Sequence, residues 1–405
     1  MPRPRGVPWP PADVASTTIP APTRAGASVE LIDHQGEAAI RSSRPDTTRP
    51  DTSRPGAAAR LAILAILAVL AVVASLVLGG CGLSSADHST PADAHETTGG
   101  ALPTSGAVGS PPASETPGPP RDHIVIILME NHGPSVLGDP AAPWLAAAAA
   151  RYRVATDYTA LAHPSQPNYI ALTSGGTQGV SNDGTVDLGV ENIVDRLEAT
   201  GKTWKAYMQS LPTGGNTPKL ASSARTLYAR KHDPFVSYTD VSSSDARMGN
   251  IVDLGQLATD AAAGALPDFA WISPDQCHDM HGIGTEASSP CPMPQTDRAL
   301  VGAADSFLAT WVPRILASPG WTDRSIIFVT WDEGADGDTS GCCGITKGGG
   351  HVALLAIMSG GPRTSSTPYN HYSLLTTISE RLGLACLGVT CDTSTVKPMT
   401  DLVGP

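Results

Sequence analysis

Residues 123–129 have the sequence HIVIILM, and Glu130 and Asn131 follow directly. An apolar, β-branched run of this length is too short for a typical helix and is typical of a strand buried on both faces. Oxygen-bearing side chains would then lie at the carboxyl end of that strand. Open α/β sheets bind their ligands at this edge. The run therefore predicts both a fold and a place for chemistry.

Similar apolar runs alternate with helical patterns through the rest of the region. We expect further strands at 268–272, 325–331 and 352–358, with a weaker one at 204–208, and helices at 143–153, 168–173, 190–199, 296–316 and 371–382. Alternation of this kind predicts an α/β domain with a mostly parallel central sheet sandwiched by helices.

The chain has 405 residues with 41 Gly and 36 Pro, and its composition is uneven. Residues 1–60 are rich in Pro, Arg and Thr without periodic apolar faces, which indicates a disordered leader or an over-extended start of the reading frame. Residues 82–120 read as a flexible Ser/Thr/Pro/Gly spacer. The domain proper is expected at 121–405. The net charge of −12 argues against nucleic acid as a partner, because a binder needs basic groups to neutralise phosphates.

Residues 61–78 form an uncharged apolar run that ends in Leu78-Gly79-Gly80-Cys81, which resembles the lipobox of bacterial lipoproteins. One interpretation of 61–81 is therefore a signal sequence with a lipid-bearing Cys81. The other is an uncleaved signal anchor. Arg54 and Arg60 precede the run, so both interpretations place the later residues outside the cytoplasm and tethered to the membrane.

Six cysteines lie in residues 121–405, and an even number in an exported chain suggests three disulfides. Pairing between neighbours favours Cys277–Cys291 and Cys386–Cys391. The adjacent Cys342 and Cys343 have no place in this scheme.

A second polar pair, Asp332 and Glu333, follows the strand expected at 325–331. Together with Glu130, these carboxylates would repel one another at one sheet edge unless a cation held them. Each pair alone is also compatible with a helix cap or a solvated loop. The oxygen-rich set favours Mg²⁺, Mn²⁺ or Ca²⁺ over Zn²⁺, which remains an alternative, and one or two ions are both compatible with it.

Ser165 comes just ahead of a predicted helix, in His163-Pro164-Ser165-Gln166-Pro167. The backbone donors and the dipole of the helix would favour negative charge at this oxygen, as a nucleophile requires. The alternative is that Ser165 only caps the helix, with Pro167 fixing its first turn.

Five blocks in order resemble the bacterial phosphoesterase family, which includes acid phosphatases and phospholipases C within the alkaline-phosphatase-like superfamily. They are IILMENH (126–132), HPSQPNYIALTSG (163–175), TWDEG (330–334), GGH (349–351) and YNHYSLLTTI (369–378). The resemblance spans about residues 122–383. It implies that Glu130, Asn131, Asp332 and Glu333 bind a divalent metal ion and that Ser165 is both a ligand and the nucleophile.

The resemblance also assigns roles to residues of two loops. Asp279 and His281 would bind the phosphate or a second metal, with Asp275 and His278 as rivals, or else this is an exposed polar loop. His351 matches the active-site histidine of the family, although histidine is unremarkable at such a loop–strand junction. A core or capping role is at least as expected for His371, and His132 and His163 could be solvated. Sulfatases of the superfamily require Arg where Tyr169 stands, which argues against that activity.

These observations predict an extracytoplasmic, metal-dependent phosphomonoesterase of the acid-phosphatase type, working through a phosphoserine on Ser165. Asp279, His281 or His351 would bind the phosphoryl group or protonate the leaving oxygen. The substrate would be a small phosphate ester or a phospholipid. The alternatives are a phospholipase C or another phosphodiesterase, and, in a different class, a non-catalytic surface-binding lipoprotein.

Overall fold

The computed structural model describes residues 121–213, 226–284 and 290–405. The predicted leader, apolar segment with Cys81, and spacer all lie outside the described residues.

An eight-stranded sheet forms the centre of the domain, in the order β5-β4-β6-β1-β7-β8-β2-β9. All neighbours pair in parallel except β8, which is antiparallel to both β7 and β2. The prediction of a mostly parallel sheet is confirmed. The strands are β1 (Ile124–Met129), β2 (Arg153–Ala155), β4 (Trp204–Met208), β5 (Ile251–Asp253), β6 (Phe269–Ser273), β7 (Ile326–Trp331), β8 (Leu354–Ile357) and β9 (Arg363–Ser365), while β3 (Tyr158–Thr159) and β10 (Tyr369–Asn370) form a separate parallel pair.

Strand β1 is completely buried, with neighbours on both sides. Its register pairs Met129 with Trp331 of β7, so the residues that follow the two strands emerge side by side. The backbone N–H of Asp332 donates to the carbonyl of Met129 over 3.0 Å, which extends this alignment past the strands.

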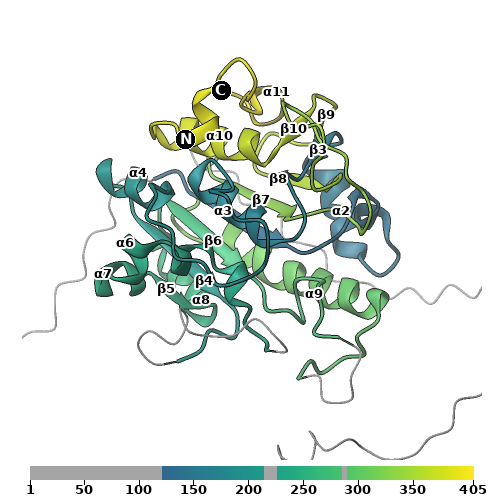
Figure 1. Ribbon diagram of the computed structural model, residues 1–405. Coiled ribbons are helices and arrows are strands. Elements are labelled where there is room, and N and C mark those ends of the chain that lie inside the picture. The colour runs from purple at the N-terminus through teal and green to yellow at the C-terminus, as the bar shows by residue number, and fades with distance from the viewer. Residues whose placement is uncertain (1–120, 214–225, 285–289) are drawn as a thin grey trace, which may run out of the picture. The chain divides into compact units, whose positions relative to one another are not determined.

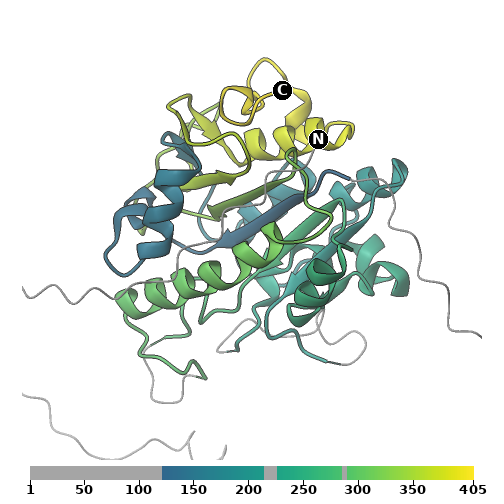
Figure 2. The same ribbon diagram turned by 180° about the vertical axis from the view of Figure 1, so that it is seen from behind.

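Helices cover both faces of the sheet. Helices α3 and α10 lie on one face, and α8 and α9 lie on the other (Figures 1 and 2). The α-helices are α2 (Pro143–Arg151), α3 (Gln166–Ser174), α4 (Ile193–Ala199), α6 (Thr239–Ser242), α7 (Asp245–Met248), α8 (Gly255–Ala263), α9 (Asp297–Leu316), α10 (His371–Leu382) and α11 (Thr400–Val403), and the 3₁₀ helices are η1 (Pro134–Gly138), η2 (Arg230–His232), η3 (Pro234–Ser237) and η4 (Gly388–Cys391).

Helix α9 is the one helix of the described residues whose length and composition would suffice to cross a membrane. Its apolar face, which includes Leu300, Leu308 and Ile315, is buried within the domain. It is therefore a core helix.

Two elements have different bounds from those predicted. The helix expected at 143–153 ends at Arg151, because Tyr152 adopts an extended conformation and Arg153 begins β2. The strand expected at 352–358 shortens to β8 and runs against its neighbours.

Three disulfides are formed within the described residues. Cys277–Cys291 and Cys386–Cys391 are confirmed as predicted. The structure pairs the adjacent Cys342 and Cys343 with each other. Three disulfides are typical of a domain that folds outside the cytoplasm.

Candidate active site

An oxygen cluster formed by Glu130, Asn131, Asp332, Glu333 and Ser165 lies at the carboxyl edge of β1 and β7. One terminal atom of the Asn131 amide lies 3.0 Å from Glu333 Oε1, 3.2 Å from Glu130 Oε2 and 3.3 Å from Asp332 Oδ1. The structure thus brings together all five residues that were predicted as metal ligands.

The cluster has the features of a cation site. If the Asn131 amide oxygen faces inward, it meets three carboxylate oxygens, an arrangement that requires a positive charge among them; with the amide reversed, its nitrogen donates to them instead. Asp332 Oδ2 is buried and has no hydrogen-bond partner in the described part of the chain. Both observations fit a hard divalent ion.

The carboxylates alone do not make a finished site. Among the described residues, no three His, Cys, Asp or Glu side chains already converge as a metal-binding group. The Asn131 amide and the Ser165 hydroxyl add two further oxygen- or nitrogen-bearing groups beside these carboxylates.

The pKa shifts of the carboxylates also indicate a cation site. Burial, and then the charges of Glu130 and Glu333, raise the pKa of Asp332 well above its usual value. Burial also raises the pKa of Glu333. These shifts are those of crowded carboxylates, and a bound cation would reverse them.

Ser165 precedes α3, and its buried hydroxyl belongs to the cluster. Its Oγ donates toward Glu130 Oε2 over 3.0 Å and lies 3.3 Å from Glu333 Oε1. The side chain makes no capping hydrogen bond to α3, so the alternative that Ser165 only caps this helix is wrong. The Asn168 amide holds the preceding segment by accepting from Leu161 N and Ala162 N.

Two basic residues that sequence analysis missed complete the surroundings of the cluster. Lys231 and His232 lie in η2, and both side chains are buried. Lys231 Nζ donates to Ser165 Oγ over 3.2 Å and to Asp183 Oδ2 over 2.9 Å. The basic triplet 230–232 in an acidic chain was the available indication in the sequence.

His232 lies between two carboxylates. Its Nε2 is 3.1 Å from Glu130 Oε1, and its Nδ1 is 3.2 Å from Asp279 Oδ2. Burial disfavours the cation, but Glu130 and Asp279 together raise the pKa of His232 to about 9. In turn, burial of Glu130 is outweighed by the charge of His232, and the pKa of Glu130 falls to about 2. Tyr169, whose ring stacks on His232 at 5.2 Å, also donates its hydroxyl to Glu130.

Asp279, His281 and His351 were also predicted as site residues, and they differ in how they are connected to the cluster. Asp279 is buried and contacts His232, so it joins the site through that imidazole. His281 is exposed, and its Nε2 lies 3.4 Å from Lys231 Nζ. The described contacts of the His351 side chain are with Asp157 and Asp338.

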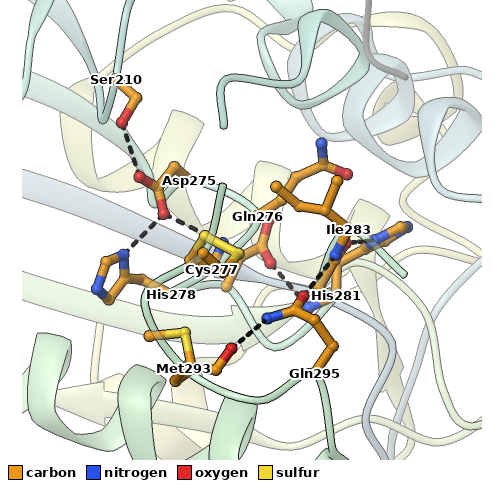
Figure 3. The surroundings of a disulfide bond; sticks show 12 residues. Ser210, Asp275, Gln276, Cys277, His278, His281, Ile283, Met293 and Gln295 are labelled. Carbon is orange, nitrogen blue, oxygen red and sulfur yellow. Dashed lines mark hydrogen bonds and ion pairs between the residues drawn. A yellow bond between two sulfur atoms is a disulfide. The ribbon is translucent and has the colours of Figure 1, made fainter. Parts of the chain in front are cut away.

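The rivals Asp275 and His278 pair with each other instead. His278 Nδ1 lies 2.7 Å from Asp275 Oδ1, and Ser210 donates to the other oxygen of Asp275 over 2.7 Å. Figure 3 shows this group beside the Cys277 disulfide, with His281 in the same view. Within the described contacts, neither rival reaches the oxygen cluster.

Three further histidines hold the cluster from outside. His163 contacts Glu333, so it is a supporting residue as well as a partly exposed one. His371 is buried, where its Nε2 donates to the Asp332 carbonyl and its Nδ1 faces the Tyr158 hydroxyl, which confirms the core role. His132 contacts the Glu130 carbonyl and Asp297.

A family model described as the Phosphoesterase family matches residues 135–385. The chain belongs to the Phosphoesterase family. The prediction of a hydrolase that acts on phosphoric ester bonds is confirmed at this level.

Curated relatives of this family member are phosphatases. The chain is 27% identical over 303 residues to a phosphate-repressible acid phosphatase of Penicillium chrysogenum, covering 72% of this chain and 67% of the relative. It is 29% identical over 285 residues to a phosphatidylinositol-3-phosphatase of Mycobacterium tuberculosis, covering 70% and 83%. Two further acid phosphatases, from Aspergillus fumigatus and Kluyveromyces lactis, are matched over 49% and 61% of their length.

Among solved structures, the domain is similar to a protein in the alkaline phosphatase superfamily from Vibrio parahaemolyticus. The sequence identity is 18% and the TM-score is 0.45, with 66% of this chain and 67% of that chain covered.

Proposed function

We propose that this member of the Phosphoesterase family is a phosphomonoesterase of the acid-phosphatase type that works through a phosphoserine on Ser165. One observation carries the proposal. The Ser165 hydroxyl lies between the carboxylates of Glu130 and Glu333 and the ammonium of Lys231, so acceptors and a cation both face one nucleophilic oxygen.

In this mechanism, Glu130, Asn131, Asp332, Glu333 and Ser165 would hold a divalent ion, with Mg²⁺, Mn²⁺ or Ca²⁺ favoured by the oxygen ligands. Such an ion, when bound, favours the deprotonated form of the hydroxyl and offsets the charge of the phosphoryl oxygens. Asn131 adopts a left-handed backbone conformation with φ of 51°, which aims its side chain and that of Glu130 from successive positions.

The chain's own groups then carry the proton and the phosphoryl group. Glu333, whose Oε1 lies 3.3 Å from Ser165 Oγ, accepts the proton of Ser165 as the new bond between Oγ and phosphorus forms. The bond from phosphorus to the ester oxygen breaks, and His281 or His351 protonates the leaving alkoxide. Water then attacks the phosphoserine, releasing inorganic phosphate and restoring the Ser165 hydroxyl.

The site would act outside the cytoplasm and next to a membrane. The three disulfides support an oxidising compartment, and residues 61–81 supply the proposed anchor, either as a lipoprotein signal or as an uncleaved helix.

A lipid headgroup is the second candidate substrate. The relative from M. tuberculosis is named for a monoester on phosphatidylinositol, and a membrane-tethered enzyme would have such lipids at hand. A phospholipase C or another diesterase would require the same site to cleave a diester bond.

Hydrolysis by the purified full chain separates these possibilities. We expect nitrophenol release from p-nitrophenyl phosphate, lost in chelator and in Ser165→Ala. Faster turnover of vesicles with phosphatidylinositol 3-phosphate would favour the lipid substrate. Turnover only of bis-p-nitrophenyl phosphate or phosphatidylcholine would favour a diesterase. A folded protein that hydrolyses none of them would contradict the enzyme and favour a surface-binding lipoprotein.

A further inference from the structure

Lys231 stands out among the residues around the nucleophile. Its side chain is 9% exposed, and its Nζ contacts Ser165 Oγ at 3.2 Å. A surface lysine would be free to sample many rotamers, but this one is buried in η2, which packs against α3. The position of its charge is therefore defined.

Asp183 fixes this position. One oxygen of Asp183 accepts from Lys231 Nζ over 2.9 Å, and the other accepts from the backbone N–H of Gln166 over 3.0 Å. Gln166 is the residue directly after Ser165. A single carboxylate thus links the ammonium to the backbone that carries the nucleophile.

The ammonium lies beside the reacting oxygen, and the Nε2 atom of His281 lies 3.4 Å from Lys231 Nζ. Asp183 forms an ion pair with this ammonium, which compensates its charge where the side chain is buried. The side-chain amide of Gln166, the residue after Ser165, is also buried, and neither of its polar atoms has a partner in the described part of the chain.

A phosphoryl group attacked by Ser165 Oγ has its non-bridging oxygens adjacent to that atom. A cation within hydrogen-bond distance of Oγ is therefore within reach of one of them. The three carboxylates of the oxygen cluster outnumber the two charges of a divalent ion, so an ion alone would not balance a doubly charged phosphate.

We propose that Lys231, positioned by Asp183, contacts a phosphoryl oxygen and makes the site selective for dianionic phosphate monoesters over monoanionic diesters. This inference rests on the proposed function, because it assumes attack by Ser165. A monoester has one more negative charge than a diester, and the interaction with a fixed cation grows with that charge. The selectivity thereby comes from the protein and not only from a bound ion.

The test compares three variants of the full chain, each loaded with Mn²⁺. They are Lys231→Met, Lys231→Arg and the control Lys205→Met. Lys205 also pairs with an aspartate, Asp260, but it lies at the beginning of β4, at the opposite end of the strand from the carboxyl edge of the sheet. The substrates are p-nitrophenyl phosphate and bis-p-nitrophenyl phosphate. Thermal unfolding verifies that each variant is folded.

We expect Lys231→Met to lower kcat/KM for the monoester by about 10²–10³-fold, the usual loss on removing one donor to a developing oxyanion. The loss for the diester should be no more than about tenfold, Lys231→Arg should recover most of the monoester rate, and Lys205→Met should leave the ratio unchanged. Equal losses on both substrates, or no loss on either, would overturn the proposal.

Binding provides a second measurement that does not need turnover. Inorganic phosphate and dimethyl phosphate are titrated calorimetrically into the wild-type protein and Lys231→Met. The affinity for phosphate should fall by at least about tenfold in the variant, while that for dimethyl phosphate changes little. If the wild type hydrolyses neither ester, the proposed function fails, and the phosphate titration still decides the role of Lys231. Unchanged phosphate affinity in Lys231→Met would contradict the proposed role of Lys231. If Lys231→Met does not fold, a fully active Asp183→Asn would contradict that role instead.

Discussion

His163 Nδ1 lies 2.5 Å from Glu333 Oε2, and the same imidazole donates from Nε2 to the carbonyl of Asp338 over 2.7 Å. Both ring nitrogens are engaged, so the ring orientation is fixed by the loop that follows β7. One oxygen of Glu333 is thereby held by His163, and the other is left to face Ser165 at 3.3 Å.

Replacing His163 should therefore weaken cation binding. Partners that orient a ligating carboxylate typically contribute ten- to hundredfold to metal affinity, so we expect about this loss of Mn²⁺ affinity in His163→Gln. Isothermal titration of Mn²⁺ into the full chain measures it. His278→Gln is the control, because His278 also pairs with a carboxylate but not with the cluster. Equal affinities for the two variants would contradict the role of His163.

Asp332→Asn should change stability in opposite directions with and without a cation. Without one, burial and then the charges of Glu130 and Glu333 disfavour the ionised Asp332 carboxylate, so a neutral amide in its place should raise the free energy of unfolding in EDTA at neutral pH by about 1–2 kcal/mol. With Mn²⁺ at about a hundred times its dissociation constant, the wild type should gain about 2.7 kcal/mol and the variant little. Urea unfolding with and without EDTA tests both.

Asp260→Asn serves as the comparison. Asp260 is paired with Lys205 and Tyr207, so its loss should destabilise the protein with and without Mn²⁺ alike. A wild type that is no more stable in Mn²⁺ than in EDTA would rule out the cation site.

The raised pKa of Asp233 predicts that the free energy of unfolding depends on pH through a group outside the oxygen cluster. Burial raises its pKa to about 7, whereas an unfolded aspartate titrates near 3.8. Between these values the folded state holds the extra proton, so this group lowers the free energy of unfolding as the pH rises from about 4 to 7. Asp233→Asn should remove that decline and gain roughly 2–4 kcal/mol relative to the wild type at about pH 8. Urea unfolding of both proteins between about pH 4 and 8 measures this difference. If the free energies of unfolding of wild type and variant change with pH in parallel, the prediction is wrong.

Gly349→Ala tests the loop between β7 and β8. A Cβ at this position would lie 2.4 Å from the Ala162 carbonyl, so the segment that leads to His163 and Ser165 would have to move. We expect a loss of about 1–3 kcal/mol in unfolding free energy together with reduced kcat. Gly138→Ala is the control, since a Cβ there meets nothing within 4 Å. Full activity of Gly349→Ala would show that this packing does not position the nucleophile.

Sequence analysis found the parts of the molecule that carry a local pattern. Strands β1 and β7 are buried on both faces and hence read as continuous apolar runs, and the pairs Glu130-Asn131 and Asp332-Glu333 were found because each follows such a strand. Short edge elements had no such pattern. Strand β9, for example, has only three residues, two of them exposed.

The basic side of the site escaped prediction for a different reason. Lys231 and His232 lie in a 3₁₀ turn and Asp183 in a loop, where no periodicity marks a position. Their importance depends on which distant residues they meet, namely Ser165, Glu130 and Asp279. Only the tertiary structure contains that information.

The pairing of β1 with β7 also bears on when activity can arise during synthesis. Asn131 and Asp332 contact each other across 201 positions of sequence. A chain that has emerged only as far as β6 contains Ser165 but lacks Asp332 and Glu333, so the oxygen cluster is still incomplete. Because contacts so distant in sequence form late in folding, hydrolysis would begin only when the domain is essentially complete.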